Sequence, residues 1–148
     1  MFECMQVSMI LYEVLRLYPP IVILNKYTWC ETRVGDMSIP AGVELCMPLL
    51  LLHYDSRYWD KPEEFNPERF NEGVSKASKD HVAFFPFGGG PRICPGQNFA
   101  FLEAKMALAC ILQHFSFQLS PTYAHAPTAA LSLTLKPQHG APIIIRRN

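Results

Sequence analysis

The residues best suited to chemistry lie in one short segment, Phe87-x-x-Gly90-x-Arg92-x-Cys94-x-Gly96. Average residue frequencies give five such matches by chance in a chain this long on the order of once in ten thousand or less. Cys94 comes just before a predicted helix, whose free N–H groups and positive dipole end stabilise a thiolate. Thiolates are among the ligands that proteins use for iron, and thiolate donation to iron favours O–O cleavage.

The neighbours of the cysteine suit a flat, anionic ligand. Arg92 is placed to meet a carboxylate through charge-assisted hydrogen bonds, and Phe87 is placed to shield the sulfur from water. Gly90 and Gly96 are expected to take backbone conformations that a side chain would forbid, which would let the ligand lie close to the loop.

The remaining metal-binding and nucleophilic residue types show no comparable pattern. The chain has five cysteines and no CxxC pair, which argues against zinc and against a disulfide framework. The other four are expected to be small buried hydrophobic residues: Cys4, Cys30, Cys46 and Cys110. The five histidines are scattered and are expected to be structural or surface residues, and the three consecutive glycines lack the GK[ST] of a phosphate loop.

Composition limits the class of protein. The chain has 148 residues, 49% hydrophobic and 18% charged, which is enough for one domain with a core. Thirteen basic residues balance thirteen acidic ones, which argues against nucleic acid as a partner. The longest apolar run, at 43–52, is about half the ~20 residues that a membrane-spanning helix needs, and the start of the chain lacks the layout of a signal peptide.

Two helices are expected to position these residues. The first is predicted at 7–17, where Pro19 and Pro20 stop it, and the second at 97–115. The first helix is apolar nearly all round and should be buried, yet it carries Glu13 and Arg16 three residues apart, and buried charges must be paired. Between and after the helices the sequence predicts extended runs at 21–24 and 27–29, turns at 35–36 and 40–42, a short helix at 48–54, a long irregular stretch at 59–82, and β-like runs at 131–135 and 143–145.

With these features together, the chain resembles the cytochrome P450 family. The cysteine loop is similar to its heme-binding signature, the segment from Glu13 to Arg16 matches its ExxR helix, and 53–70, with Trp59 and the PERF motif, resembles the stretch before the heme loop. The resemblance covers 7–148. The residues around the cysteine loop and in the C-terminal tail resemble plant members of the clan that includes secologanin synthase. Gly89 is a departure, because plant relatives usually have Trp there.

The resemblance implies a fold and a set of site residues. The fold would be α+β, mainly helical: residues 1–148 would be a partial P450 domain with the ExxR helix, small β-sheets, a coil meander, the Cys-ligand loop and the long helix that follows. Cys94 would be the axial ligand of the iron in heme b. The other cofactor-binding residues would be Arg92, Phe87, Gly90, Gly96 and Lys26. Glu13, Arg16 and Arg69 would form a buried structural triad.

The resemblance also implies an activity. The family's enzymes are heme-thiolate monooxygenases that use O2 and electrons from an NADPH-dependent reductase at the cytosolic face of the endoplasmic reticulum membrane. The substrate would be a small apolar metabolite such as a terpenoid or a hormone, contacted near 21–24 and 128–131. The alternative is a non-catalytic, truncated product that at most binds heme, because the membrane anchor and the helix over the distal heme face are missing from this chain.

Overall fold

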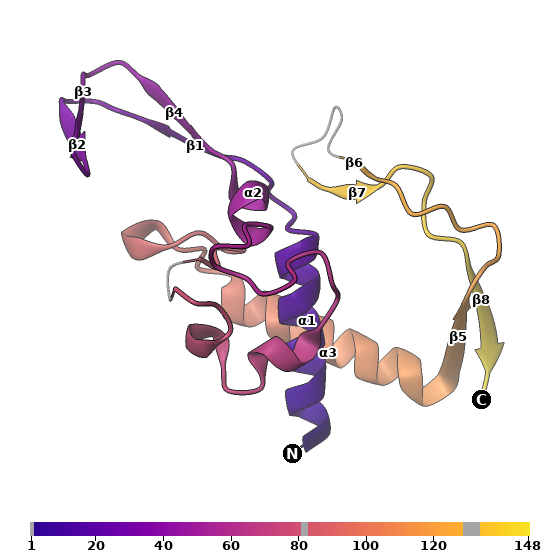
Figure 1. Cartoon of the computed structure of the whole chain (residues 1–148). Coiled ribbons are helices and arrows are strands. Elements are labelled where there is room, and N and C mark those ends of the chain that lie inside the picture. Colours follow the sequence, from indigo (N-terminus) through magenta and orange to yellow (C-terminus); the bar gives the residue numbers. More distant parts are fainter. Residues whose placement is uncertain (1, 81–82, 129–133) are drawn as a thin grey trace.

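The computed structural model describes residues 2–80, 83–128 and 134–148. Two long helices cross near the centre of the molecule, and small two-stranded sheets project from them on either side (Figure 1). The elements in chain order are α1 (Phe2–Leu17), β1 (Leu24–Tyr27), β2 (Thr32–Val34), β3 (Met37–Ile39), β4 (Glu44–Met47), α2 (Leu49–His53), η1 (Pro67–Phe70), η2 (Val74–Lys76), η3 (Gly90–Arg92), α3 (Gln97–His114), β5 (Phe115–Leu119), β6 (Pro127–Thr128), β7 (Lys136–Pro137) and β8 (Ile143–Arg147).

Helix α1 starts earlier than its apolar pattern predicts and ends at the expected prolines. One stripe of it is buried, formed by Met9, Glu13, Arg16 and Leu17 at helical spacing. The rest of its surface is not: Ile10 is 43% exposed and Val14 is 38% exposed. The prediction that this helix is buried all round therefore holds for one face only.

The strands after α1 form at a different place from the predicted extended runs. β1 covers 24–27 and pairs antiparallel with β4, in a register that places Lys26 opposite Leu45. The prediction of runs at 21–24 and 27–29 rests on β-branched and aromatic content, but pairing with the partner strand decides which residues join a sheet. The turn at 35–36 forms as predicted. It joins β2 and β3, which pair with each other between β1 and β4 in the chain.

A small aromatic core lies where α1 meets the irregular stretch after α2. Met9, Trp59, Phe70 and Ala83 are its buried members, and partly buried aromatic residues such as Phe84 pack against it. In its described residues, 54–80, the stretch contains two 3-10 helices, η1 and η2, and the rest of this backbone is turns and coil. The core is thus made by residues of this irregular stretch, and of the chain just after it, packed on one helix.

Helix α3 and the C-terminal strands form the other half of the molecule (Figure 1). α3 covers 97–114, almost as predicted, and leads directly into β5, which pairs with β8. The run predicted at 131–135 lies mostly outside the described residues, although Leu135 donates its N–H to Pro20 O at 3.0 Å. None of the residues of α3 is buried, and its exposed apolar side chains include Phe99, Leu102 and Met106.

Three of the four cysteines expected to be buried are exposed. Cys30 and Cys46 belong to the projecting strands and turns between α1 and α2, and Cys110 lies on the uncovered α3. The side chain of Cys4 lies outside the described residues. Free cysteines are usually buried because most of them lie in a core, and these elements have no packed core around them. Among the described residues, no helix has both the length and the apolar character needed to cross a membrane.

Candidate functional site

The loop from Phe85 to Gly96 is held in shape by its own backbone. Gly88 donates its N–H to Phe85 O at 3.1 Å, and Cys94 donates its N–H to Phe87 O at 2.9 Å. Gly90 begins the 3-10 helix η3 with φ of +67°, a conformation that L side chains rarely adopt. The loop therefore folds back on itself and brings Cys94 beside the turn that starts it.

The sulfur of Cys94 is at the surface, three residues before α3 begins. The expectation that Gly96 needs a special backbone is wrong: its φ is −83°, which any residue can adopt. A Cβ at position 96 would instead lie 3.7 Å from Cys94 Sγ. The absence of a side chain at 96 thus keeps the space beside the sulfur open.

A pocket of about 340 Å³ opens beside the sulfur. One part of its wall is apolar and comes from the chain just after α1, from β1 and from α2, and the cysteine loop forms the rest. Its charged and sulfur-bearing members are Arg92, Lys26 and Cys94. The structure therefore brings together the cysteine and both cations that the sequence singled out.

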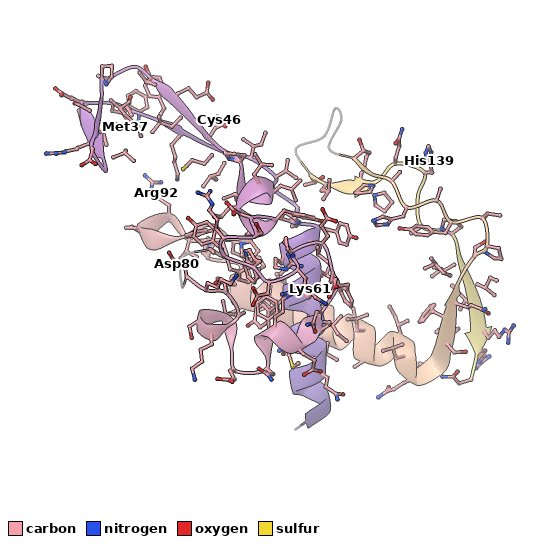
Figure 2. The ribbon with its side chains drawn as sticks, in the orientation of Figure 1. Met37, Cys46, Lys61, Asp80, Arg92 and His139 are labelled. Atoms are coloured by element: carbon pink, nitrogen blue, oxygen red, sulfur yellow. The ribbon has the colours of Figure 1, made fainter. Side chains whose placement is uncertain are left out.

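The two cations of this pocket have no protein partner. In the ranges that the structure describes, neither Arg92 nor Lys26 makes an ion pair or a side-chain hydrogen bond. Figure 2 shows Arg92 on the loop at the periphery of the molecule. Two unpaired cations and an exposed thiol around one apolar pocket form a site for an anionic, partly apolar ligand.

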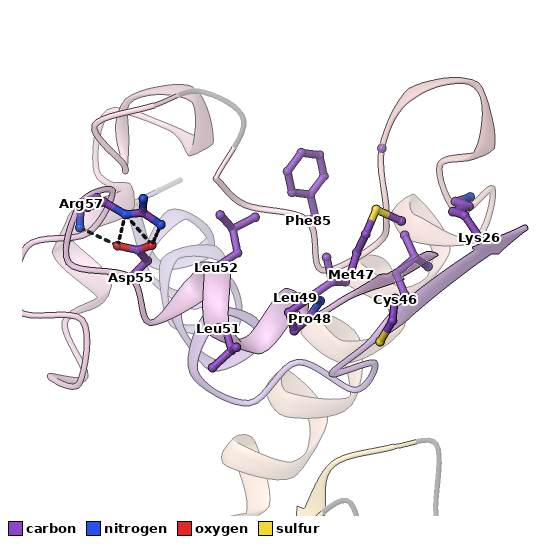
Figure 3. A pocket seen from close by; sticks show the side chains of 12 residues that line it. Lys26, Cys46, Met47, Pro48, Leu49, Leu51, Leu52, Asp55, Arg57 and Phe85 are labelled. Carbon is purple, nitrogen blue, oxygen red and sulfur yellow. Dashed lines mark hydrogen bonds and ion pairs between the residues drawn. The ribbon is translucent and has the colours of Figure 1, made fainter. Parts of the chain in front are cut away.

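A second, wider pocket of about 600 Å³ adjoins the first and shares Lys26 and Phe85 with it. Figure 3 shows its elongated form, with the hydrogen-bonded pair of Arg57 and Asp55 at one end and Lys26 at the other. The ring of Phe85 is placed tightly against Gly89, because a Cβ at position 89 would lie only 2.7 Å from Phe85 Cε1. Phe85 thus occupies space that any side chain at position 89 would need.

Phe87 lies on the other side of the loop. Its ring centroid is 5.6 Å from that of Phe101 on α3, and it lines both the cysteine pocket and an apolar pocket of about 270 Å³ between α1 and α3. Phe87 is half-buried in this position. It therefore packs between the loop and α3, close to the cysteine as the sequence predicts.

The three charged residues expected to form a triad lie together beneath this site. Glu13 and Arg16 are both fully buried, and Arg16 donates Nε and Nη2 hydrogen bonds to the two Glu13 oxygens at 2.8 Å each. Arg69 donates its Nε hydrogen bond to Glu13 Oε1 at 3.2 Å. We call these three side chains the ion-pair hub.

The two arginines of the hub also donate hydrogen bonds to backbone carbonyls at the end of α2 and in the irregular stretch that follows it. Arg16 donates to the carbonyls of His53, Pro62 and Glu64. Arg69 donates to the carbonyls of Asp60 and Lys61. The guanidinium of Arg16 lies 5.2 Å from the ring centroid of Trp59, which adds a cation–π contact.

His53 is a polar residue of this region whose contacts the sequence did not reveal. Its side chain is fully buried; Nδ1 lies 3.1 Å from Arg16 O, and Nε2 accepts the Phe85 N–H at 3.1 Å. The pKa of His53 is lowered to about 4, mainly by burial; the hydrogen bond to the Arg16 carbonyl opposes this shift, and the charge of Arg16 adds to it. Both partners are backbone atoms, so no residue type or spacing in the sequence signals them.

The fold and this arrangement are those of a known class. The sequence profile of the family described as Cytochrome P450 matches residues 5–143, and the chain belongs to that family. Cytochrome P450 72A397 of Kalopanax septemlobus is 61% identical over 142 residues, which cover 95% of this chain and 27% of that protein. The 11-oxo-beta-amyrin 30-oxidase of Glycyrrhiza uralensis is 57% identical with the same coverage.

A solved structure agrees with these relatives. The retinoic acid bound cyanobacterial CYP120A1 matches with a TM-score of 0.83 and 28% identity, covering 97% of this chain and 32% of that one. The predicted fold, α+β with small sheets around two helices in the manner of the P450 family, is confirmed. The chain spans about a quarter of the length of the curated relatives it matches, 27% of each of the two above.

Heme is the cofactor that this family implies, and the site has the features that heme requires. Heme is flat and apolar, carries two propionate groups, and takes a thiolate ligand in P450 enzymes. The pocket offers one exposed sulfur, two unpaired cations and apolar walls, and Gly96 leaves the sulfur uncovered. These residues fit the group.

The residues expected near a substrate are only partly described. Ile21 lines the cysteine pocket, as does Leu24 at the start of β1. Thr128 lies in β6, whereas 129–131 fall outside the described residues. An isolated bridge pairs Ile21 with Thr134, just before β7. The start of the β7 segment therefore lies beside the chain that leaves α1.

Proposed function

We propose that this chain is the heme-binding part of a heme-thiolate monooxygenase, with residues 1–148 forming one portion of a P450 domain. The observation that supports this most is the exposed Cys94 sulfur in a pocket with two unpaired cations. Bound heme would supply the iron that binds and activates O2, and thiolate donation favours O–O cleavage. Cys94 would hold the iron, and Arg92 and Lys26 would hold the propionates.

The other residues would act on the geometry of the site. Phe87 would keep water from the sulfur, because its ring is packed between the loop and α3. Gly90 would provide the left-handed turn that leads into Arg92, and Gly96 would leave room beside the sulfur. The ion-pair hub would fix the scaffold behind the loop and would take no part in the chemistry.

The proposed substrate is a small apolar metabolite such as a terpenoid. One relative is named as an oxidase of 11-oxo-beta-amyrin, and the similar solved structure has retinoic acid bound. Ile21 and Leu24 give the pocket apolar walls that suit such a molecule. Electrons would come from an NADPH-dependent reductase at the endoplasmic reticulum membrane, as in the family.

The test is reconstitution of the chain with heme, followed by reduction and addition of CO. Thiolate ligation should appear in the spectrum of the wild type and be absent in Cys94→Ala. Cys110→Ala is the matched control, because it removes another exposed thiol from α3 and should leave the spectrum unchanged. Identical spectra for Cys94→Ala and the wild type would refute the ligand assignment.

A second candidate is a product that binds heme without catalysis. The exposed apolar side chains of α3 favour it, because no element among the described residues covers this helix. Product formation by the reconstituted chain with a reductase would exclude this candidate. Thiolate ligation without turnover would favour it.

A further inference from the structure

We propose that His53 is a positioning residue that fixes the Cys94 loop on the ion-pair hub. The proposal rests on the proposed function for its heme readout only. The imidazole ring of His53 contacts both the hub and the loop. Its nitrogens lie 3.1 Å from Arg16 O on α1 and 3.1 Å from the Phe85 nitrogen at the start of the loop.

The chemistry of these partners allows one form of the ring. A carbonyl oxygen only accepts and a backbone N–H only donates. The ring must therefore be neutral, with its proton on Nδ1 facing Arg16 O and a free lone pair on Nε2 facing Phe85. Protonated His53, or the other tautomer, would place two hydrogens or two lone pairs face to face.

The ring has little freedom to leave this arrangement. His53 is fully buried, and its own carbonyl accepts a hydrogen bond from Arg16 Nη1 at 2.9 Å. The ring of Phe84 lies at 5.5 Å between centroids. The backbone and side chain of His53 are thus both fixed to the hub.

A short path leads from His53 to the sulfur. Phe85 accepts the Gly88 N–H, which closes the first turn of the loop, and its ring is placed against Gly89. Phe87, in the same turn, accepts the Cys94 N–H at 2.9 Å. A shift of Phe85 would therefore move the turn to which Cys94 is hydrogen-bonded.

The loop has no comparable attachment elsewhere. Within the described part of the chain, the bond from Phe85 to His53 is the one hydrogen bond between residues 85–96 and a side chain. All of these residues are half-buried or exposed. The buried imidazole is thus the polar anchor of a loop that otherwise lies near the surface.

Two substitutions separate the contacts of His53. In His53→Gln the side-chain amide reaches the position of Nε2, so its oxygen can accept the Phe85 N–H. In His53→Asn the shorter amide reaches only the position of Nδ1, so the contact with Arg16 O is kept and the one with Phe85 is lost. Both variants place a neutral amide in the same buried space, which makes them a matched pair.

Hydrogen exchange of the heme-free chain is the first readout. The Phe85 and Cys94 amides should exchange about tenfold faster in His53→Asn, as expected for the loss of a buried hydrogen bond, and within about threefold of the wild type in His53→Gln. Met9→Ala, a change in the core on the same helix, is the control for general loosening. Equal exchange of both amides in the Asn and Gln variants would overturn the proposal.

The second readout is the fraction of reduced, CO-bound chain that shows thiolate ligation, compared at equal folded fraction. It should fall in His53→Asn, be restored in His53→Gln and be unchanged in Met9→Ala; a fraction equal in all three would overturn the proposal. If Cys94→Ala shows that the thiolate is not the ligand, the exchange result still tests His53 alone. Nitrogen-15 chemical shifts of the wild-type ring provide a test that needs no variant, because a ring protonated on Nε2 would also overturn the proposal.

Discussion

The ion-pair hub and the Cys94 loop contain the same kinds of charged group in opposite conditions. In the hub, the guanidinium of Arg16 is fully buried and bonded to a carboxylate and three carbonyls. In the loop, the guanidinium of Arg92 is exposed and has no protein partner among the described residues. Buried charged groups whose hydrogen bonds are all made within the protein stabilise a scaffold. Charged groups around a pocket that have no protein partner are available to a ligand.

The two regions are close in space, yet they should respond differently to change. Damage to the hub should lower the stability of the fold, because buried charges left without partners are costly. Loss of an unpaired cation from the loop should lower ligand affinity and leave the fold almost unchanged. His53 lies between them and should show both effects.

The largest effect is expected from Arg16→Ala. It leaves the buried carboxylate of Glu13 without its main partner, and the free energy of unfolding should fall by about 3–5 kcal/mol. Urea denaturation followed by circular dichroism measures this. Lys61→Ala breaks the exposed ion pair with Glu64 and should cost less than about 1 kcal/mol, so equal losses would contradict the contrast between the hub and the surface.

Acid should weaken the fold through His53. Its pKa of about 4 in the folded chain lies below the ordinary value of 6.5, so the unfolded chain binds a proton first as the pH falls. The stability contributed by neutral His53 is complete above pH 6.5 and is lost progressively down to about pH 4. The total is about 3 kcal/mol, and Arg16 of the hub is the charged group that acts on the ring.

His53→Gln provides the control for this pH dependence, because an amide does not titrate. Unfolding free energies of the two proteins should converge as the pH is lowered from 6.5 to 4. A constant difference over this range would mean that the buried imidazole does not contribute.

Arg92→Ala should act on the cofactor and leave the fold intact. Loss of a hydrogen bond to a charged group costs about 1.5–3 kcal/mol, so heme affinity should fall by about ten- to a hundredfold. The unfolding free energy of the heme-free chain should change by less than about 0.5 kcal/mol, because Arg92 has no partner to lose among the described residues. A large loss of heme-free stability would contradict the separation of the two regions.

The smallest effects are expected from the loop glycines. Gly90→Ala should destabilise the heme-free chain by about 1–2 kcal/mol, because φ of +67° crowds a Cβ. Gly96→Ala should be close to neutral in the heme-free chain, because its φ of −83° is ordinary and 3.7 Å is a normal contact distance. Thermal unfolding of both variants measures the difference, and equal losses would contradict it.

Much of the hub can be predicted from the sequence. Charges on a helix that is otherwise apolar are expected to be buried in pairs, and this expectation points to Glu13 and Arg16. The order of the motifs then adds Arg69 and the cysteine loop. The sequence also predicts helix α3 to within a residue of its observed end, because a long helical pattern is a strong local signal.

The rest depends on partners that a sequence does not display. β1 forms at 24–27 because β4 pairs with it there, not because its residues are the best strand formers nearby. The role of His53 is invisible for a similar reason, since both of its hydrogen bonds go to backbone atoms of residues 37 and 32 positions away. Local propensity describes a segment, and these features belong to pairs of distant segments.

The bonds of Arg16 have a consequence for how the coil segment becomes rigid. Its five N–H donors reach two carboxylate oxygens and three carbonyls, which is all that one guanidinium can offer. A lysine has three donors on a single nitrogen and could not span the same acceptors. The conformation of the coil between α2 and η1 therefore depends on hydrogen bonds from α1. We expect this coil to remain disordered during folding until α1 has formed.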